Sequence, residues 1–235
     1  MDNLTTERHR SGSQLRDLIL GGQDGLVNVL GIVLGASAAT QDTKVLISVG
    51  LAATFAESLA MGAVAYTSFK AEKEHYDSEL VRERREIRET PEREIEEVRE
   101  IYRQKGFEGE LLEQVVRQIC SNEEIWVGVM MSEELGLKPI DTSGLVKTAL
   151  SVGLSSIVGS LVPLVPFLFL PLGYGVVVSL AFSALVLFVV GFYKGKVTAG
   201  HGWRSAAELA VIGMGAALAG YAISLLVTRA LLGGH

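Results

Sequence analysis

Residues 18–40 read LILGGQDGLVNVLGIVLGASAAT, and this stretch decides what kind of protein the chain forms. A helix needs about 20 apolar residues to cross the ~30 Å hydrocarbon core of a bilayer, and this stretch is long enough. Further stretches of similar length and character lie at residues 45–69, 145–170, 173–193 and 206–227. We therefore predict an all-α membrane protein with five transmembrane helices.

The composition points to a membrane protein because the charged residues are segregated. Of the 235 residues, 49% are hydrophobic and 20% are charged, yet the mean hydropathy reaches +0.34. The charges crowd into the middle of the chain and leave long stretches almost uncharged. A net charge of −6 makes nucleic acid a poor partner, because phosphate binding needs clustered cations. The single cysteine, Cys120, excludes an internal disulfide and a cysteine-based metal cluster.

The positions of Lys and Arg predict the orientation in the membrane. The polar segment 1–17 and the loop at 194–204 carry three cations each, whereas the segments at the other ends of the spans carry one or none. Cytoplasmic loops are enriched in Lys and Arg. We therefore predict a cytosolic N-terminus and an external C-terminus. The predicted parts are a tail at 1–17, spans within 18–69, a cytosolic helical domain at 70–139 inserted between the second and third spans, and spans within 140–235.

The charged insert at residues 70–139 is predicted to be helical throughout. Apolar residues recur at helical spacing past the second span, so we expect that helix to continue without a break into the insert. Thr90-Pro91 then resembles an N-cap followed by proline at the first helical position. Ser121-x-x-Glu124 predicts a capping box that opens a later segment. The segments are expected to pack on one another or against a second copy.

Asp24 and Glu57 fall inside the first and second predicted spans. Asp24 and Glu57 would each cost roughly 2.5–3.5 kcal/mol in hydrocarbon on insertion scales, so such groups usually face a cavity and have a function. Asn28 follows Asp24 by one helical turn, and Met61 follows Glu57 by one turn, so each pair shares a helix face. These four residues are candidates for a pathway that carries a divalent cation or protons. The alternative for Asp24 is that it lies at the membrane edge and caps the helix.

The insert is strongly acidic, with 19 Asp and Glu against 12 Lys and Arg between residues 70 and 138. A negative module next to a membrane concentrates cations, although most of these glutamates are expected to be solvated surface charge. Carboxylates suit hard ions, and thioether sulfur shifts the preference towards softer first-row metals. The alternative for methionines is a place in the hydrophobic core. Residues with helical spacing that suits a metal site are Glu83, Glu86, Glu94, Glu97, Met130, Met131 and Glu134.

A competing metal motif is Glu72-x-x-His75, which matches one element of ferritin-like di-iron proteins. Such bundles need two elements of this kind. His9, His201 and His235 are not preceded by glutamate at that spacing, so a di-iron oxidase is not expected. The chain also has no phosphate-binding loop motif and no nucleophile elbow motif. We therefore expect no enzyme activity and no permanently bound cofactor.

Two motifs resemble a known family. Residues 24–35, DGLVNVLGIVLG, look like the first-helix signature of the vacuolar iron transporter family, and residues 55–62, FAESLAMG, are similar to its second-helix pattern. The resemblance covers essentially the whole chain, including the span count and the glutamate-rich insert. It implies a homodimer in a lipid bilayer that moves Fe²⁺ out of the cytosol in exchange for protons, for detoxification or storage. Some members also carry Mn²⁺, and Zn²⁺ and Co²⁺ are further candidates.

The resemblance also implies roles for individual residues. In that family a cytosolic three-helix module binds metal through glutamates and a Met-Met-x-x-Glu run, and the membrane pathway maps here onto Asp24, Glu57 and Met61. The short chain favours a prokaryotic cell membrane over a vacuolar one. The alternative function is a membrane-anchored metal-buffering or metal-sensing protein that uses the same insert without transport. The module's ligands map here onto Glu83, Glu86, Glu94, Glu97, Met130, Met131 and Glu134.

Overall fold

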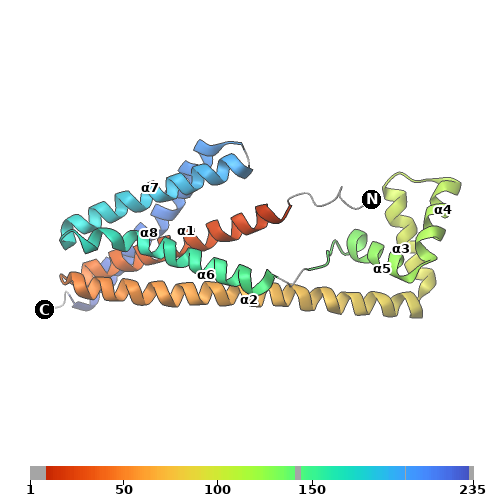
Figure 1. Cartoon of the computed structure of the whole chain (residues 1–235), viewed down its shortest axis with the longest axis horizontal. Coiled ribbons are helices and arrows are strands. Elements are labelled where there is room, and N and C mark those ends of the chain that lie inside the picture. The colour runs from red at the N-terminus through yellow and green to blue at the C-terminus, as the bar shows by residue number, and fades with distance from the viewer. Residues whose placement is uncertain (1–8, 141–143, 199, 233–235) are drawn as a thin grey trace. The chain divides into compact units, whose positions relative to one another are not determined.

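The computed structural model describes residues 9–140, 144–198 and 200–232, and all regular secondary structure among them is helical (Figure 1). Within these residues, five helical segments are long and apolar enough to cross a membrane, so the predicted all-helical membrane fold and the span count are confirmed. Residues 1–8 of the predicted tail and His235 lie outside the described residues. The spans belong to α1 (His9–Ala39), α2 (Thr43–Glu89), α6 (Leu145–Leu161) with the 3-10 helix η3 (Val162–Leu168), α7 (Leu172–Thr198) and α8 (Gly202–Leu232).

The chain divides into two compact units. Met1–Tyr66 and Val146–His235 form what we call the membrane unit, and Thr67–Leu145 form what we call the insert. Helix α2 contributes to both, because it runs without a break from Thr43 to Glu89, as the sequence predicts. About 20 residues suffice to cross a bilayer, so the second half of this 47-residue helix lies beyond its apolar span.

Helix α1 is central in the membrane unit. Its Val29, Leu30, Val33 and Leu34 are completely buried against neighbouring helices. The side of α1 that faces α8 comes close to that helix at Gly35. The carbonyl oxygen of Gly35 accepts a hydrogen bond from Ser224 Oγ at 3.1 Å. Small residues allow such approaches between membrane helices, where packing and hydrogen bonds rather than the hydrophobic effect drive association.

Prolines shape the end of the third span. Pro163 and Pro166 lie in η3, which continues α6 as a tighter helix. Pro166 has no N–H group to donate to the Pro163 carbonyl three residues earlier. Ser179 Oγ on α7 donates to that carbonyl at 2.7 Å, so the buried acceptor is satisfied across the helix interface.

The insert has a hydrophobic core of its own, formed by helices that pack on one another. After α2 come α3 (Pro91–Gln104), α4 (Gly109–Cys120), α5 (Glu123–Val129) and a π-helical turn, η1 (Met130–Glu134). Leu111, one of the apolar residues of α4, is exposed and does not join this core. The buried core residues are Ile87, Val98, Leu112, Val116, Ile119, Trp126, Val127, Met130 and Met131.

In the insert, one predicted helix start is confirmed and one predicted cap is wrong. Pro91 opens α3 directly after Thr90, as predicted, because proline disfavours a helical conformation in the residue before it. The capping box at Ser121 is wrong. Ser121 still has helical backbone angles at the end of α4, so Asn122 caps α5 instead and its Oδ1 accepts from the backbone N–H of Glu124 at 2.9 Å.

Candidate functional site

A cluster of carboxylates lies where α2 meets α3. The turn at Thr90-Pro91 brings Glu83 and Glu94 together, and each is only 1% exposed. Glu86, one turn after Glu83, is half-buried. One carboxylate oxygen from each of these three residues lies within 4.8 Å of the other two. Glutamates that the sequence singles out on two separate helices, Glu83 and Glu86 on α2 and Glu94 on α3, therefore lie close together.

Two oxygens of this cluster are unpartnered. Glu83 Oε2 and Glu94 Oε2 are buried, and neither has a hydrogen-bond partner among the described residues. Several other acidic residues of the insert pair with arginine, for example Glu113 with Arg99 Nε at 2.8 Å, and Glu83 itself pairs with Arg82 through its other oxygen, Oε1. Buried carboxylates are normally paired with a cation or coordinate a metal, because an isolated buried charge is unfavourable. The unpartnered oxygens thus distinguish the cluster from the surrounding surface charge.

The electrostatics of the cluster reflect this crowding. Burial raises the pKa of the Glu94 carboxyl to about 7, and the negative charges of Glu97 and Glu83 add to the effect. The pKa of Glu83 is also raised by burial, although a hydrogen bond from Arg82 Nη2 at 3.2 Å opposes the shift. Desolvation and nearby carboxylates raise the pKa of Glu134 as well. A divalent cation would relieve both the burial cost and the repulsion.

The raised pKa of Glu94 predicts how the stability of the metal-free insert depends on pH. The carboxyl has an ordinary pKa of 4.5 when unfolded and about 7 when folded, so the folded state binds the proton more tightly. The free energy of unfolding should therefore fall as pH rises from about 4.5 to 7, by up to roughly 3 kcal/mol. Glu94→Gln should remove most of this slope, and Glu83 and Glu134 account for the remainder.

Trp126 in the core of the insert can report this unfolding by its fluorescence, once Trp203 of the membrane unit is replaced by phenylalanine. Denaturation would be followed at pH 5 and pH 8 in the metal-free protein, with and without Glu94→Gln. An equal pH dependence in both proteins would show that Glu94 is not the responsible group.

The other predicted ligands surround the cluster in different ways. Glu97 is half-buried and accepts from Arg93 Nε at 3.0 Å. Glu134 is exposed on η1, yet its charge is close enough to help raise the pKa of Glu94. Met130 and Met131 are buried in the hydrophobic core of the insert, which is the alternative that the sequence left open. Their role as metal ligands stays a prediction.

In the membrane unit, the predicted pathway residues of α1 and α2 meet. Asn28 Nδ2 donates to Glu57 Oε1 at 3.1 Å, and the carboxyl group of Asp24 lies close to that of Glu57. Asp24 lies fifteen residues after the start of α1 and therefore does not cap it. Met61 is half-buried one turn after Glu57.

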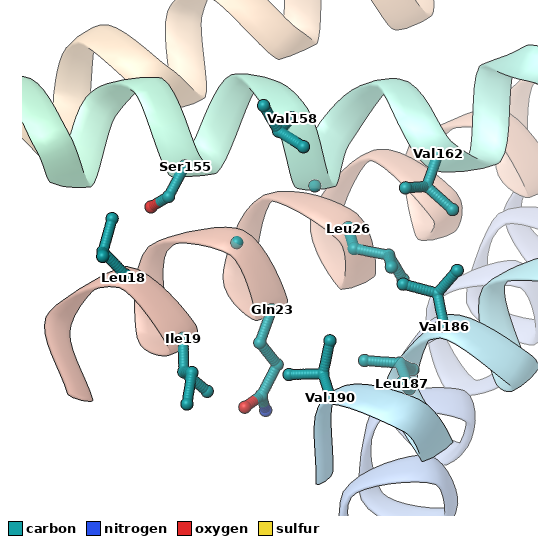
Figure 2. A pocket seen from close by; sticks show the side chains of 12 residues that line it. Leu18, Ile19, Gln23, Leu26, Ser155, Val158, Val162, Val186, Leu187 and Val190 are labelled. Carbon is teal, nitrogen blue, oxygen red and sulfur yellow. The ribbon is translucent and has the colours of Figure 1, made fainter. Parts of the chain in front are cut away.

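The membrane unit also contains an apolar groove of about 350 Å³ between α1, α6 and α7 (Figure 2). Leu18, Ile19 and Val190 are among the side chains that line it. Among its described lining residues, Gln23 and Ser155 carry the polar side chains. Figure 2 shows no carboxylate in this groove, so its donor set does not suit a divalent cation. Asp24 and Glu57 remain the candidate ion pathway.

Sequence reasoning missed two residues that lie beside this pathway. Ser58 directly follows Glu57, and its Oγ donates to Ser156 Oγ of α6 at 3.3 Å in a buried contact. The available signal was weak, because serines and glycines are common in every membrane helix.

The fold and these residues define a multi-pass helical membrane protein with a buried carboxylate cluster in a helical insert. The chain belongs to the VIT family, whose family model matches residues 15–225, so the family resemblance seen in the sequence is confirmed. Vacuolar iron transporter 1 of Arabidopsis thaliana is 32% identical over 228 residues, covering 97% of this chain and 91% of the relative. Proteins of the same name from Tulipa gesneriana and Oryza sativa subsp. japonica are each 34% identical over 220 residues. Both alignments cover 93% of this chain, with 89% and 87% of the respective relatives.

Proposed function

We propose that this protein is a proton-coupled divalent metal transporter that removes Fe²⁺ from the cytosol for detoxification or storage. The observation that carries the proposal is the contact of Asp24 and Asn28 on α1 with Glu57 on α2, inside two apolar spans. Membership of the VIT family and relatives named vacuolar iron transporters support iron as the cargo. Mn²⁺, Zn²⁺ and Co²⁺ are further candidate ions, because oxygen donors with a nearby thioether suit several first-row metals.

Exchange of metal for protons follows from the chemistry of the Asp24–Glu57 pair. Two carboxyls that lie this close repel each other when both are charged, so a proton on one of them relieves the repulsion. A metal ion requires the deprotonated form, so its arrival releases the proton and its departure allows the proton to return. Asn28 holds Glu57 by donating to Oε1, which leaves the other oxygen for the ion. Met61 adds a soft donor on the same helix face.

The insert is proposed to collect the metal on the cytosolic side. The unpartnered oxygens of Glu83 and Glu94 support a cation-binding site between α2 and α3. Glu86 completes the set of close oxygens, and Glu97 and Glu134 add negative charge around it. Fe²⁺ is the cargo at this site, and the protein needs no permanently bound cofactor.

A homodimer is proposed from the exposure of the pathway. Asp24 and Asn28 are exposed on the surface of the membrane unit, although they lie within the apolar span of α1. Contact of a carboxyl with lipid tails is unfavourable, so a second copy that covers this face would stabilise it. The distribution of Lys and Arg supports a cytosolic N-terminus and a cytosolic insert.

The test is a flux measurement with purified protein in proteoliposomes. Fe²⁺ uptake should require a pH gradient and should stop when an ionophore collapses that gradient. The lumen should become more alkaline during uptake, because protons leave as the metal enters. Mn²⁺, Zn²⁺ and Ca²⁺ would be added as competitors. Binding of Fe²⁺ without any flux would instead favour the metal-buffering or metal-sensing alternative.

A further inference from the structure

Helix α6 packs against both helices that carry the pathway acids, and its backbone comes close to the backbone of each. On the α1 side, a Cβ atom added at Gly25 would lie 2.5 Å from the carbonyl oxygen of Ser156 and 2.5 Å from Ser160 Oγ. On the α2 side, a Cβ atom added at Gly153 would lie 3.1 Å from the carbonyl oxygen of Ser58. A methyl group at Gly25 would therefore overlap α6, and one at Gly153 would press against α2.

These contacts fall directly beside the acids. Gly25 follows Asp24 in the chain, and Ser58 follows Glu57. Ser156 is completely buried and touches both sides, because its Oγ accepts a hydrogen bond from Ser58 while its carbonyl oxygen and Oγ face Gly25. One residue of α6 therefore contacts both helices at the level of the acid pair.

We propose that Ser156 is a positioning residue, which sets the separation of Asp24 and Glu57 by holding α1 and α2 against one helix. The inference rests on the proposed transport function of that pair. Metal coordination tolerates deviations of only about 0.2 Å in ligand distance, so small movements of either helix weaken ion binding. Hydrogen bonds between membrane helices contribute little to stability on average, and loss of this one is expected to alter the geometry more than the fold.

The experiment measures Fe²⁺ flux and thermal stability for Ser156→Ala, Ser58→Ala and the double variant in proteoliposomes. Ser156→Ala should raise the KM for Fe²⁺ roughly tenfold, since small misplacements of reacting groups have effects of this order or larger. The double variant should be no worse than either single one, because both remove the same hydrogen bond. Ser183→Ala on α7 is the matched control, as Ser183 is equally buried and its Oγ has no hydrogen-bond partner among the described residues.

A steric pair of variants tests the same idea independently. Gly25→Ala should impair transport strongly, whereas Gly22→Ala should be tolerated, because its new Cβ would lie 3.4 Å from the nearest atom, an ordinary contact distance. If Gly25→Ala does not fold, the Ser156→Ala result decides alone.

Three outcomes are distinguishable. An unchanged KM in Ser156→Ala, in a preparation whose wild type transports Fe²⁺, overturns the positioning role and leaves the transport function intact. A fall in maximal rate and thermal stability with an unchanged KM also overturns it, because that pattern reflects only a loss of folded protein. Absence of flux in the wild type contradicts the proposed function itself.

Discussion

Replacing Glu57 by glutamine is expected to lower Fe²⁺ flux by about 100-fold or more. Glutamine has nearly the same shape and keeps an oxygen that can accept from Asn28 Nδ2, which lies 3.1 Å from Glu57 Oε1. It loses the charge that binds a divalent cation and the site that exchanges a proton, and loss of groups that merely orient metal ligands already costs 10–100-fold. Asp24→Asn should have an effect of similar size, because the two carboxyls lie close together in the same pathway.

The matched control for both variants is Asp42→Asn, which removes an exposed carboxylate from the loop between α1 and α2 and keeps the oxygen that accepts from the backbone N–H of Lys44. Its flux should equal that of the wild type. Thermal stability and metal binding by the insert should be unchanged in all three variants. Full transport by either Glu57→Gln or Asp24→Asn would rule out the assigned pathway.

Replacing Glu83 and Glu94 together by glutamine is expected to weaken divalent metal binding by the full-length protein about 100-fold. These are the residues whose buried oxygens have no partner among the described residues, so a cation gains most by binding them. Calorimetry with Mn²⁺, which resists oxidation in air, measures the affinity directly. Transport at low metal concentration should fall in parallel and recover when the metal concentration is raised, because the pathway residues remain intact.

Glu113→Gln combined with Glu124→Gln is the control for the loss of two negative charges. Both residues belong to the insert and pair with arginines, at 2.8 Å to Arg99 Nε and 2.7 Å to Arg84 Nη2. Metal affinity in this control should change by no more than a few-fold. An equal loss in both double variants would mean that the general negative charge of the insert, rather than a defined site, attracts the ion.

Much of the architecture could be predicted from the pattern of apolar residues. Spans are recognisable because a bilayer requires a long uncharged helix, and all five coincide with helices of the structure. The extension of α2 beyond its span was predictable because apolar residues continue at helical spacing up to Ile87. The cap of α5 was not, because Ser121 and Asn122 are both good caps and only the end of α4 decides between them.

The candidate sites divide in the same way. Charged residues within an apolar span stand out by their cost, so Asp24 and Glu57 were recognisable from the sequence alone. Among the many glutamates of the insert, spacing selected a subset that shares helix faces. Spacing did not reveal which of them are buried without a partner, because that depends on the arginines of other helices.

The amino-acid sequence by itself determined the five spans, the acidic insert and the positions of the acids along their helices, because these depend on local composition and helical periodicity. Only the tertiary structure decided that Glu83 and Glu94 face each other, that Met130 and Met131 lie in the hydrophobic core, and that Ser156 touches both α1 and α2. The physical reason is that periodicity defines the faces of a helix, whereas the packing between helices determines what each face meets.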